Sequence, residues 1–265
     1  MSDIKQHIEL LQLIEYYGFS AKLVGGAVRD FFLKIKFNDI DIATTAKPSD
    51  IKNIAEKENL KYIAFGEQYG ACRLFFKEKL YEITTLRNEK NGYKNIQFTN
   101  SFEIDSMRRD FTINAIYLDS NKKIYDYHNG LNDLKNHRII FIGEPKIRIQ
   151  QDPIRLLRYV RFCIKYGDAN IDKNIIFDNI KLLQNANKSK IINELIKILS
   201  LKNAKKITQI LNIIFYNLFD INFIHLPQNS IGKNALYRIL SSSKNIEQLS
   251  ENFGLSLSKL LPYKV

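Results

Sequence analysis

The sequence contains no tryptophan, and it has only two cysteines, two methionines and five prolines among its 265 residues. Cys72 and Cys163 are far apart and each lies in an apolar run, which excludes a disulfide scaffold and predicts two buried thiols in a reducing compartment. No apolar run approaches the roughly 18 residues that span a bilayer. The first residues show no signal-peptide or transit-peptide pattern. We therefore expect a globular protein of the cytoplasm, or of an organellar matrix in a eukaryote, with no membrane contact.

Acidic side chains are scarce in the second half of the chain. Residues 1–134 carry 19 basic and 19 acidic side chains, whereas residues 135–265 carry 21 basic and 9 acidic ones, so the whole net charge of +12 lies in the second segment. A lysine-rich composition caused by an AT-rich genome would raise lysine in both halves and does not explain this asymmetry. A neutral part joined to a strongly basic part predicts chemistry in the first and a bound polyanion, such as nucleic acid, in the second.

Hydrophobic periodicity changes near residue 140, from a mixture of strand and helix patterns to helix patterns alone. The first part is typical of an α/β fold, and the second of an all-helical one. In the first part we predict helices at 3–17, 27–33 and 48–58, helical turns over 102–115, a polar loop at 87–97, and strands at 21–24, 39–44, 62–65, 71–76, 80–86, 116–119 and 123–127. In the second part we predict helices over 145–166, 173–215, 233–243 and 246–261, with a break at 220–231.

Two glycines separate a predicted strand from a predicted helix at Gly25 and Gly26. Glycine lets the backbone approach an anion closely, and the helix start presents unpaired N–H groups. Arg29, in the first helical turn, adds a positive charge. The sequence is not a Walker motif, because no GK[ST] follows. A nucleotide-binding turn and a plain strand-to-helix turn both remain open at this point.

Two aspartates, Asp39 and Asp41, alternate with isoleucines in a predicted strand, so both carboxylates point to one face. Carboxylates that close together repel unless a cation lies between them, and hard oxygen ligands suit Mg²⁺. Glu82 joins them if its own strand lies alongside, and three carboxylates can hold two metal ions. The alternatives are a solvated strand edge for the aspartates and a surface position for Glu82.

Two arginine-rich segments follow. Arg108, Arg109, Asp110 and Asn114 could hold phosphates and a ribose, or form a surface helix with an internal ion pair. In the second segment, Asp152 could accept a hydrogen bond from the exocyclic amine of cytosine or adenine, while Arg155 donates to the adjacent ring nitrogen. Uracil and guanine present a carbonyl where Asp152 needs a donor. The alternative is a helix ion pair. If Asp152 and Arg155 read the base, Arg158 and Arg161, which lie on the same predicted helix, bind phosphates.

Six segments occur in the order found in class II tRNA nucleotidyltransferases and bacterial poly(A) polymerases: LVGGAVRD, DID, YEITTLR, MRRDFTINAIYL, YDYHNGLNDLKNHRIIFIGEP and QDPIRLLRYVRF. The chain resembles this family over about residues 20–170. The resemblance implies an α/β nucleotidyltransferase head with a small mixed sheet and flanking helices (1–140), a helical neck with a nucleotide-selecting helix (141–200) and a reduced helical tRNA-binding body (201–265). It implies two-metal transfer of CMP and AMP from CTP and ATP onto the 3′ end of tRNA.

The resemblance also implies roles for single residues. Asp39 and Asp41 match the metal-binding aspartates, and Glu82 matches the associated acid. Contacts to the nucleotide are implied for Gly26, Arg29, Arg109, Arg158 and Arg161, and pairing with the incoming base for Asp152 and Arg155.

Three departures from the family pattern bear on function. Gln151 stands where the family usually has glutamate, the segment between Arg87 and Phe98 is short, and the helical body is small. CC-adding members of the family have that segment reduced. An enzyme that adds only CC, a poly(A) polymerase and a degenerate RNA-binding relic therefore remain alternatives to CCA addition. The sequence leaves the oligomeric state open.

Overall fold

The computed structural model describes residues 4–37, 39–93, 96–221 and 232–241, together with residues 247, 251 and 253. The chain forms two compact units. Unit 1 comprises residues 1–136 with 140–142, and unit 2 comprises residues 137–139 with 143–265. The predicted break at 220–231 and the predicted helix at 246–261 lie largely outside the described residues.

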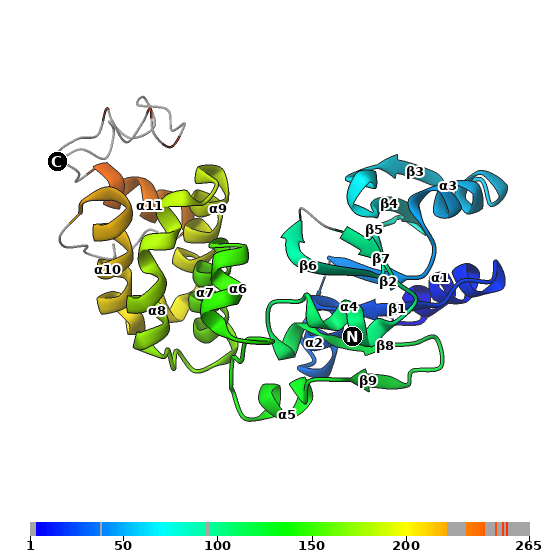
Figure 1. The fold of residues 1–265 in the computed structure, drawn as a ribbon, viewed down its shortest axis with the longest axis horizontal. Helices are drawn as coiled ribbons and strands as arrows, with labels where there is room; N and C mark the ends of the chain where they lie inside the picture. The colour runs from blue at the N-terminus through cyan, green and yellow to red at the C-terminus, as the bar shows by residue number, and fades with distance from the viewer. Residues whose placement is uncertain are drawn as a thin grey trace. The chain divides into compact units, whose positions relative to one another are not determined.

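A seven-stranded mixed sheet forms the centre of unit 1 (Figure 1), in the order β3-β4-β5-β2-β1-β8-β9. Strands β2 and β5 are parallel, and the other neighbours are antiparallel. Each of the seven strands falls where the sequence predicts one. Their bounds are β1 Ala21–Val24, β2 Ile40–Thr44, β3 Lys61–Ala64, β4 Ala71–Phe76, β5 Lys79–Thr85, β8 Ile116–Leu118 and β9 Ile124–Asp126.

Helices flank this sheet and complete its core. Helix α1 buries Leu10, Leu11 and Ile14 in the cluster that also takes Ile42 and Ile83 from the sheet. The described helices of unit 1 are α1 Ile4–Tyr16, α2 Gly26–Phe32, α3 Pro48–Lys57, α4 Phe102–Met107 and α5 Gly130–Lys135, with short 3₁₀ turns at Glu67–Tyr69 and Thr112–Asn114. Unit 1 is therefore the α/β head that the sequence predicts.

The prediction of a loop at 87–97 is wrong. Strands β6 (Arg87–Tyr93) and β7 (Ile96–Phe98) form a separate antiparallel pair, in which Arg87 lies opposite Phe98. The polar composition of the segment predicted solvent exposure. Arg87 and Glu89 are instead buried, because the Arg87 Nε donates a hydrogen bond to Glu89 Oε1 at 2.8 Å. An internal ion pair thus allows a polar segment to form a strand.

The described elements of unit 2 are helical, as predicted. They are α6 Pro145–Gln151, α7 Ile154–Tyr166, α8 Lys173–Asn179, α9 Lys188–Leu199, α10 Thr208–Phe219 and α11 Gly232–Ser241, with 3₁₀ turns at Ile180–Asn185 and Lys202–Ile207. Helix α7 packs against α9. The division of this unit at residue 200 into a neck and a body stays a prediction. Among the described helices, none is both long enough and apolar enough to cross a membrane.

Candidate active site

Gly25 lies at the turn between β1 and α2, with φ +75°. A Cβ atom at this position would stand 3.3 Å from the Asp41 Oδ2, 3.9 Å from the Arg109 Nη1 and 4.0 Å from the backbone oxygen of Asn114. The positive φ and the close approach both favour glycine. Three segments that are far apart in the sequence thus converge on the space that the missing side chain leaves open.

A row of residues crosses the sheet beside this space. Val24 on β1 is the direct partner of Asp41 on one side and of Tyr117 on the other. Asp41 is in turn the partner of Glu82 in the parallel pair β2–β5, and Glu82 is the partner of Arg73. Direct partners place their side chains on the same face of a sheet. The sequence predicted that Glu82 joins the aspartates if its strand lies beside theirs. The structure shows that the two strands are neighbours.

The Glu82 carboxylate makes an ion pair with Arg73, whose Nη2 lies 3.2 Å from the Glu82 Oε2. The Arg73 guanidinium lies 3.7 Å from the centre of the Phe65 ring. Within the described ranges, no three histidine, cysteine, aspartate or glutamate side chains come close enough together to hold a metal ion. The role predicted for Glu82 stays a prediction, and its carboxylate has a protein partner that the sequence did not indicate.

Asp39 and Asp41 are the carboxylates predicted to hold a divalent cation, and this assignment stays a prediction. Asp39 is exposed just before β2, and Asp41 is partly buried within it. Their ligand atoms are hard oxygens, which Mg²⁺ prefers. The space at Gly25 lies directly beside the Asp41 Oδ2. The residues present therefore suit a magnesium ion that also takes oxygens from a phosphate.

Arg29 is buried and is hydrogen-bonded to Asn114 of the segment 108–115. Its Nε donates to Asp30 Oδ1 at 2.8 Å, and its Nη1 donates to Asn114 Oδ1. The amide of Asn114 donates in turn to Asp110 Oδ1 at 3.0 Å. The interpretation of 108–115 as a surface helix is wrong, because Asp110 and Asn114 are buried and the segment makes only a short 3₁₀ turn.

Asp105 was missed by the sequence prediction, although three side chains of the site donate hydrogen bonds to it. It is fully buried in α4, where its Oδ1 accepts from Arg108 Nε at 2.8 Å and its Oδ2 accepts from Arg109 Nη2 at 3.0 Å. The Tyr117 hydroxyl donates to the same Oδ2 at 2.9 Å. Burial alone would raise the pKa of Asp105, but the two guanidinium groups and these hydrogen bonds outweigh it and lower the pKa.

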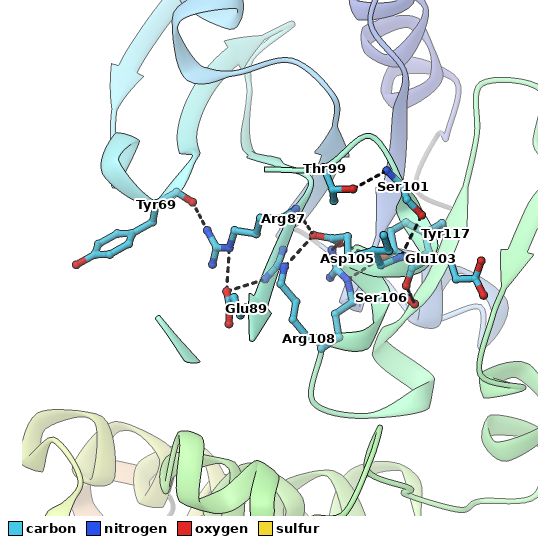
Figure 2. A network of polar contacts seen from close by, with 12 residues as sticks. Tyr69, Arg87, Glu89, Thr99, Ser101, Glu103, Asp105, Ser106, Arg108 and Tyr117 are labelled. Atoms are coloured by element: carbon cyan, nitrogen blue, oxygen red, sulfur yellow. Dashed lines mark hydrogen bonds and ion pairs between the residues drawn. The ribbon is translucent and has the colours of Figure 1, made fainter. Parts of the chain in front are cut away.

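Asp105 also connects the site to the β6–β7 pair (Figure 2). Its Oδ1 accepts from the backbone N–H of Arg87 at 3.2 Å, and Arg108 Nη1 lies 3.6 Å from the Glu89 Oε1. The spacing of Asp105 three and four residues before two arginines is the signal that could have indicated this cluster from the sequence.

In unit 2, Gln151 holds two arginines. Its Oε1 accepts from Arg155 Nη1 at 3.2 Å and from Arg148 Nη1. Arg155 Nη1 also donates to the Arg148 backbone oxygen at 3.0 Å, so the guanidinium lies back along the end of α6. Asp152 is partly exposed, and its Oδ1 accepts from the backbone N–H of Ile154 at 3.3 Å. The Asp152 side chain thus contacts the first residue of α7 and stays partly exposed.

Arg161 makes an ion pair between helices α7 and α9, with its Nε 2.6 Å from the Glu194 Oε2. Glu194 is buried, which by itself raises its pKa, but Arg161 and Lys197 outweigh burial and the pKa of Glu194 is lowered. The guanidinium groups of Arg158 and Arg161 lie 5.6 and 4.4 Å from the centre of the Phe162 ring. The nucleotide contacts predicted for these two arginines stay predictions.

Comparisons with known proteins agree with this architecture. Residues 21–140 match the family model of the poly A polymerase head domain. The chain is 37% identical over 196 residues to a CCA-adding enzyme of Lactobacillus helveticus, covering 71% of this chain and 48% of the relative. It is 34% identical over 250 residues to the mitochondrial CCA tRNA nucleotidyltransferase 1 of Homo sapiens, covering 91% of this chain and 56% of the relative. The chain spans about half the length of these curated relatives.

A solved structure, that of Bacillus stearothermophilus CCA-adding enzyme in complex with CTP, superposes with a TM-score of 0.74 at 25% identity and covers 100% of this chain and 66% of that chain. The fold is thus the nucleotidyltransferase fold of CCA-adding enzymes. Residues 21–140 thus match the head domain of poly A polymerases, and over most of its own length the chain is similar to CCA-adding enzymes.

Proposed function

We propose that the chain is a tRNA nucleotidyltransferase that adds CMP and AMP from CTP and ATP to the 3′ end of tRNA without a nucleic-acid template. The observation that carries this proposal is the convergence of Asp41, Arg109 and Asn114 on the space at Gly25. A carboxylate that suits a metal ion and a guanidinium that suits a phosphate or ribose meet there. Nucleotidyl transfer requires that combination of groups.

In this proposal Asp39 and Asp41 hold Mg²⁺ in a two-metal site. Bound at such a site, magnesium supplies activation of the attacking RNA 3′-hydroxyl and charge stabilisation on the leaving pyrophosphate. Glu82, the direct strand partner of Asp41, is in this proposal the acid associated with the two aspartates. In this step the RNA 3′-oxygen forms a new phosphodiester bond to the α-phosphate of the nucleotide, and the bond from that phosphate to pyrophosphate breaks, so that pyrophosphate is released.

The nucleotide is bound by groups that are held in place before it arrives. Arg29, fixed by Asp30 and Asn114, and Arg109, fixed by Asp105, supply positive charge in unit 1. Because these contacts are already formed, little ordering is required of the two side chains when a triphosphate binds. Asp110 and Asn114 support the nucleotide through the same buried network.

Base selection belongs to unit 2 in this proposal. Asp152 accepts from the exocyclic amine of cytosine or adenine, and Arg155 donates to the adjacent ring nitrogen. The hydrogen bonds from Arg155 to Gln151 and to the Arg148 carbonyl support this assignment, because they fix the guanidinium at the start of α7. Arg158 and Arg161 add positive charge on the same helix.

The excess of 21 basic over 9 acidic side chains in residues 135–265 supports RNA as the partner of the helical part. The compartment in this proposal is the cytoplasm, or an organellar matrix as for the mitochondrial human relative. Only two cysteines are present and both are buried and unpaired, which is compatible with a reducing compartment.

The test is incubation of the full chain with Mg²⁺, CTP and ATP and a tRNA that lacks its 3′ CCA, with the products resolved at single nucleotides. We expect addition of C, C and A, followed by a stop. Products that end after CC identify an enzyme that adds only CC, and long A tails on unrelated RNA identify a poly(A) polymerase. No extension of any RNA by the folded chain would contradict the proposal.

A further inference from the structure

Arg109, Asp105 and Tyr117 form a closed ring of hydrogen bonds in unit 1. The Arg109 Nε donates to the Tyr117 hydroxyl at 3.0 Å, and that hydroxyl donates to the Asp105 Oδ2 at 2.9 Å. The Arg109 Nη2 donates to the same Oδ2 at 3.0 Å. The guanidinium is therefore held along one edge by two different groups.

This ring determines which nitrogen of Arg109 faces the active site. With Nε on Tyr117 and Nη2 on Asp105, the Nη1 is the nitrogen that lies toward Gly25 and Asp41. A contact to Asp105 alone would let the guanidinium rotate about its Nη2. The second contact, to Tyr117, removes that freedom, since a planar group held at two points has a fixed orientation.

The sheet explains why Tyr117 can do this. Tyr117 on β8 and Asp41 on β2 are both partners of Val24, so the two side chains leave the same face of the sheet. The Tyr117 ring is fully buried and packs edge-on against Phe102, and the Arg109 guanidinium lies 5.1 Å from its centre. Figure 2 shows Tyr117 beside Asp105 in this network. The ring packs into the core while its hydroxyl reaches the site.

We propose that the Tyr117 hydroxyl is a positioning group that orients Arg109 toward the nucleoside triphosphate. This inference rests on the proposed function, and Tyr117 itself touches no reacting atom in it. The Tyr117 hydroxyl affects binding of the incoming triphosphate rather than binding of the RNA, because it acts through Arg109. Neither the spacing of the motifs nor the family resemblance assigns a role to this hydroxyl.

The test is the variant Tyr117→Phe, which keeps the ring and its packing and removes only the hydroxyl. We expect the KM for CTP to rise roughly 5- to 20-fold, which is less than the roughly 10- to 150-fold of a directly lost hydrogen bond to a charged group, because Arg109 keeps its contact to Asp105. The Kd of CTP, measured by calorimetry without tRNA, should rise by the same factor. The KM for tRNA and the kcat should change by less than about threefold.

Tyr125→Phe is the matched control. The Tyr125 hydroxyl also donates to an aspartate of unit 1, Asp119, at 3.1 Å, but it lies outside the Arg109 ring. This variant removes a hydroxyl of the same kind and should leave the KM for CTP unchanged. Thermal melting of both variants reports any purely structural effect of losing a hydroxyl.

The outcomes separate this inference from the proposed function. If the wild-type chain extends tRNA and Tyr117→Phe raises the KM for CTP no more than Tyr125→Phe does, the positioning role is wrong and the function stands. An equal rise in the KM for CTP and for tRNA, with a lowered melting temperature, also overturns it. If the folded wild-type chain neither binds CTP nor extends tRNA, the proposed function itself fails.

Discussion

Asp41 and Tyr117 lie in one row across the sheet of unit 1, each opposite Val24 of the strand between them. The row continues on the other side of Asp41 to Glu82 and Arg73. One face of the sheet thus carries, in order, the Arg73–Glu82 ion pair, the aspartate proposed to bind a metal ion, and the tyrosine that is hydrogen-bonded to Arg109. The strand register thus places Asp41 and Tyr117, the residue that orients Arg109, on the same face of the sheet.

Replacing Asp39 or Asp41 by asparagine should remove nucleotide transfer and leave tRNA binding nearly intact. The amide keeps the shape of the side chain but loses the charge that a cation requires, so we expect a loss on the order of 10²- to 10³-fold in kcat. Single-turnover extension of tRNA measures the rate, and filter binding measures the affinity. Asp178→Asn, at an exposed position of α8, is the control. Turnover near the wild-type rate in either variant would contradict the metal assignment.

Much of this architecture follows from the sequence, and the exceptions share a physical cause. The pattern of apolar residues along the chain predicted the seven strands of the sheet. The β6–β7 pair was missed because Arg87 and Glu89 are polar and are buried by pairing with each other. Asp105 was missed for the same reason. Local polarity predicts exposure, and only the folded chain shows which charges find partners.

The candidate site shows the same limit. The strand position of Asp41 and the turn at Gly25 were predictable, since strand patterns and glycine geometry are local properties, whereas Asp39 lies just before the strand that was predicted to contain it. The ion pair of Glu82 with Arg73 was not, because it depends on which strand lies on the far side of β5. The hydrogen bond from Arg29 to Asn114 likewise joins residues 85 positions apart.

Asp105 should contribute pH-dependent stability to unit 1. Its pKa is lowered in the folded protein, so the stabilisation is fully present above the ordinary aspartate pKa of 3.8 and is lost as the pH falls through the lower folded value. Asp105→Asn should destabilise the protein by roughly 3–5 kcal/mol at pH 7, since it leaves buried guanidinium groups without their carboxylate. Urea unfolding from pH 7 to pH 3 measures this. The difference between variant and wild type should shrink below about pH 4, and a constant difference across the range would show that the charge of Asp105 does not stabilise the fold.

Gln151→Glu should strengthen the hold on Arg155. The Gln151 Oε1 accepts hydrogen bonds from both Arg148 and Arg155. A carboxylate would make both hydrogen bonds charge-assisted. This stabilises the folded protein by about 1 kcal/mol more than a neutral acceptor does. We expect a higher melting temperature and a larger preference for CTP over UTP. Gln150→Glu adds the same charge at the neighbouring exposed position and should change neither. Equal effects of the two substitutions would mean that only net charge matters.

The last prediction concerns the choice of base. If Asp152 and Arg155 select the incoming base, Asp152→Ala should relax discrimination against UTP and GTP more than it slows addition of C. A correct base loses one hydrogen bond, about 1 kcal/mol, whereas a wrong base no longer meets a carboxylate opposite its carbonyl. Arg155→Ala should instead slow addition of both C and A, because it removes the donor that both bases use. Since the Asp152 Oδ1 also accepts a hydrogen bond from the Ile154 N–H at the start of α7, each variant needs its melting temperature measured beside its incorporation of all four nucleotides. A lowered melting temperature with an unchanged C:U ratio would make the two residues parts of the scaffold, and Arg158 on the same helix would then be the first residue to test for base selection.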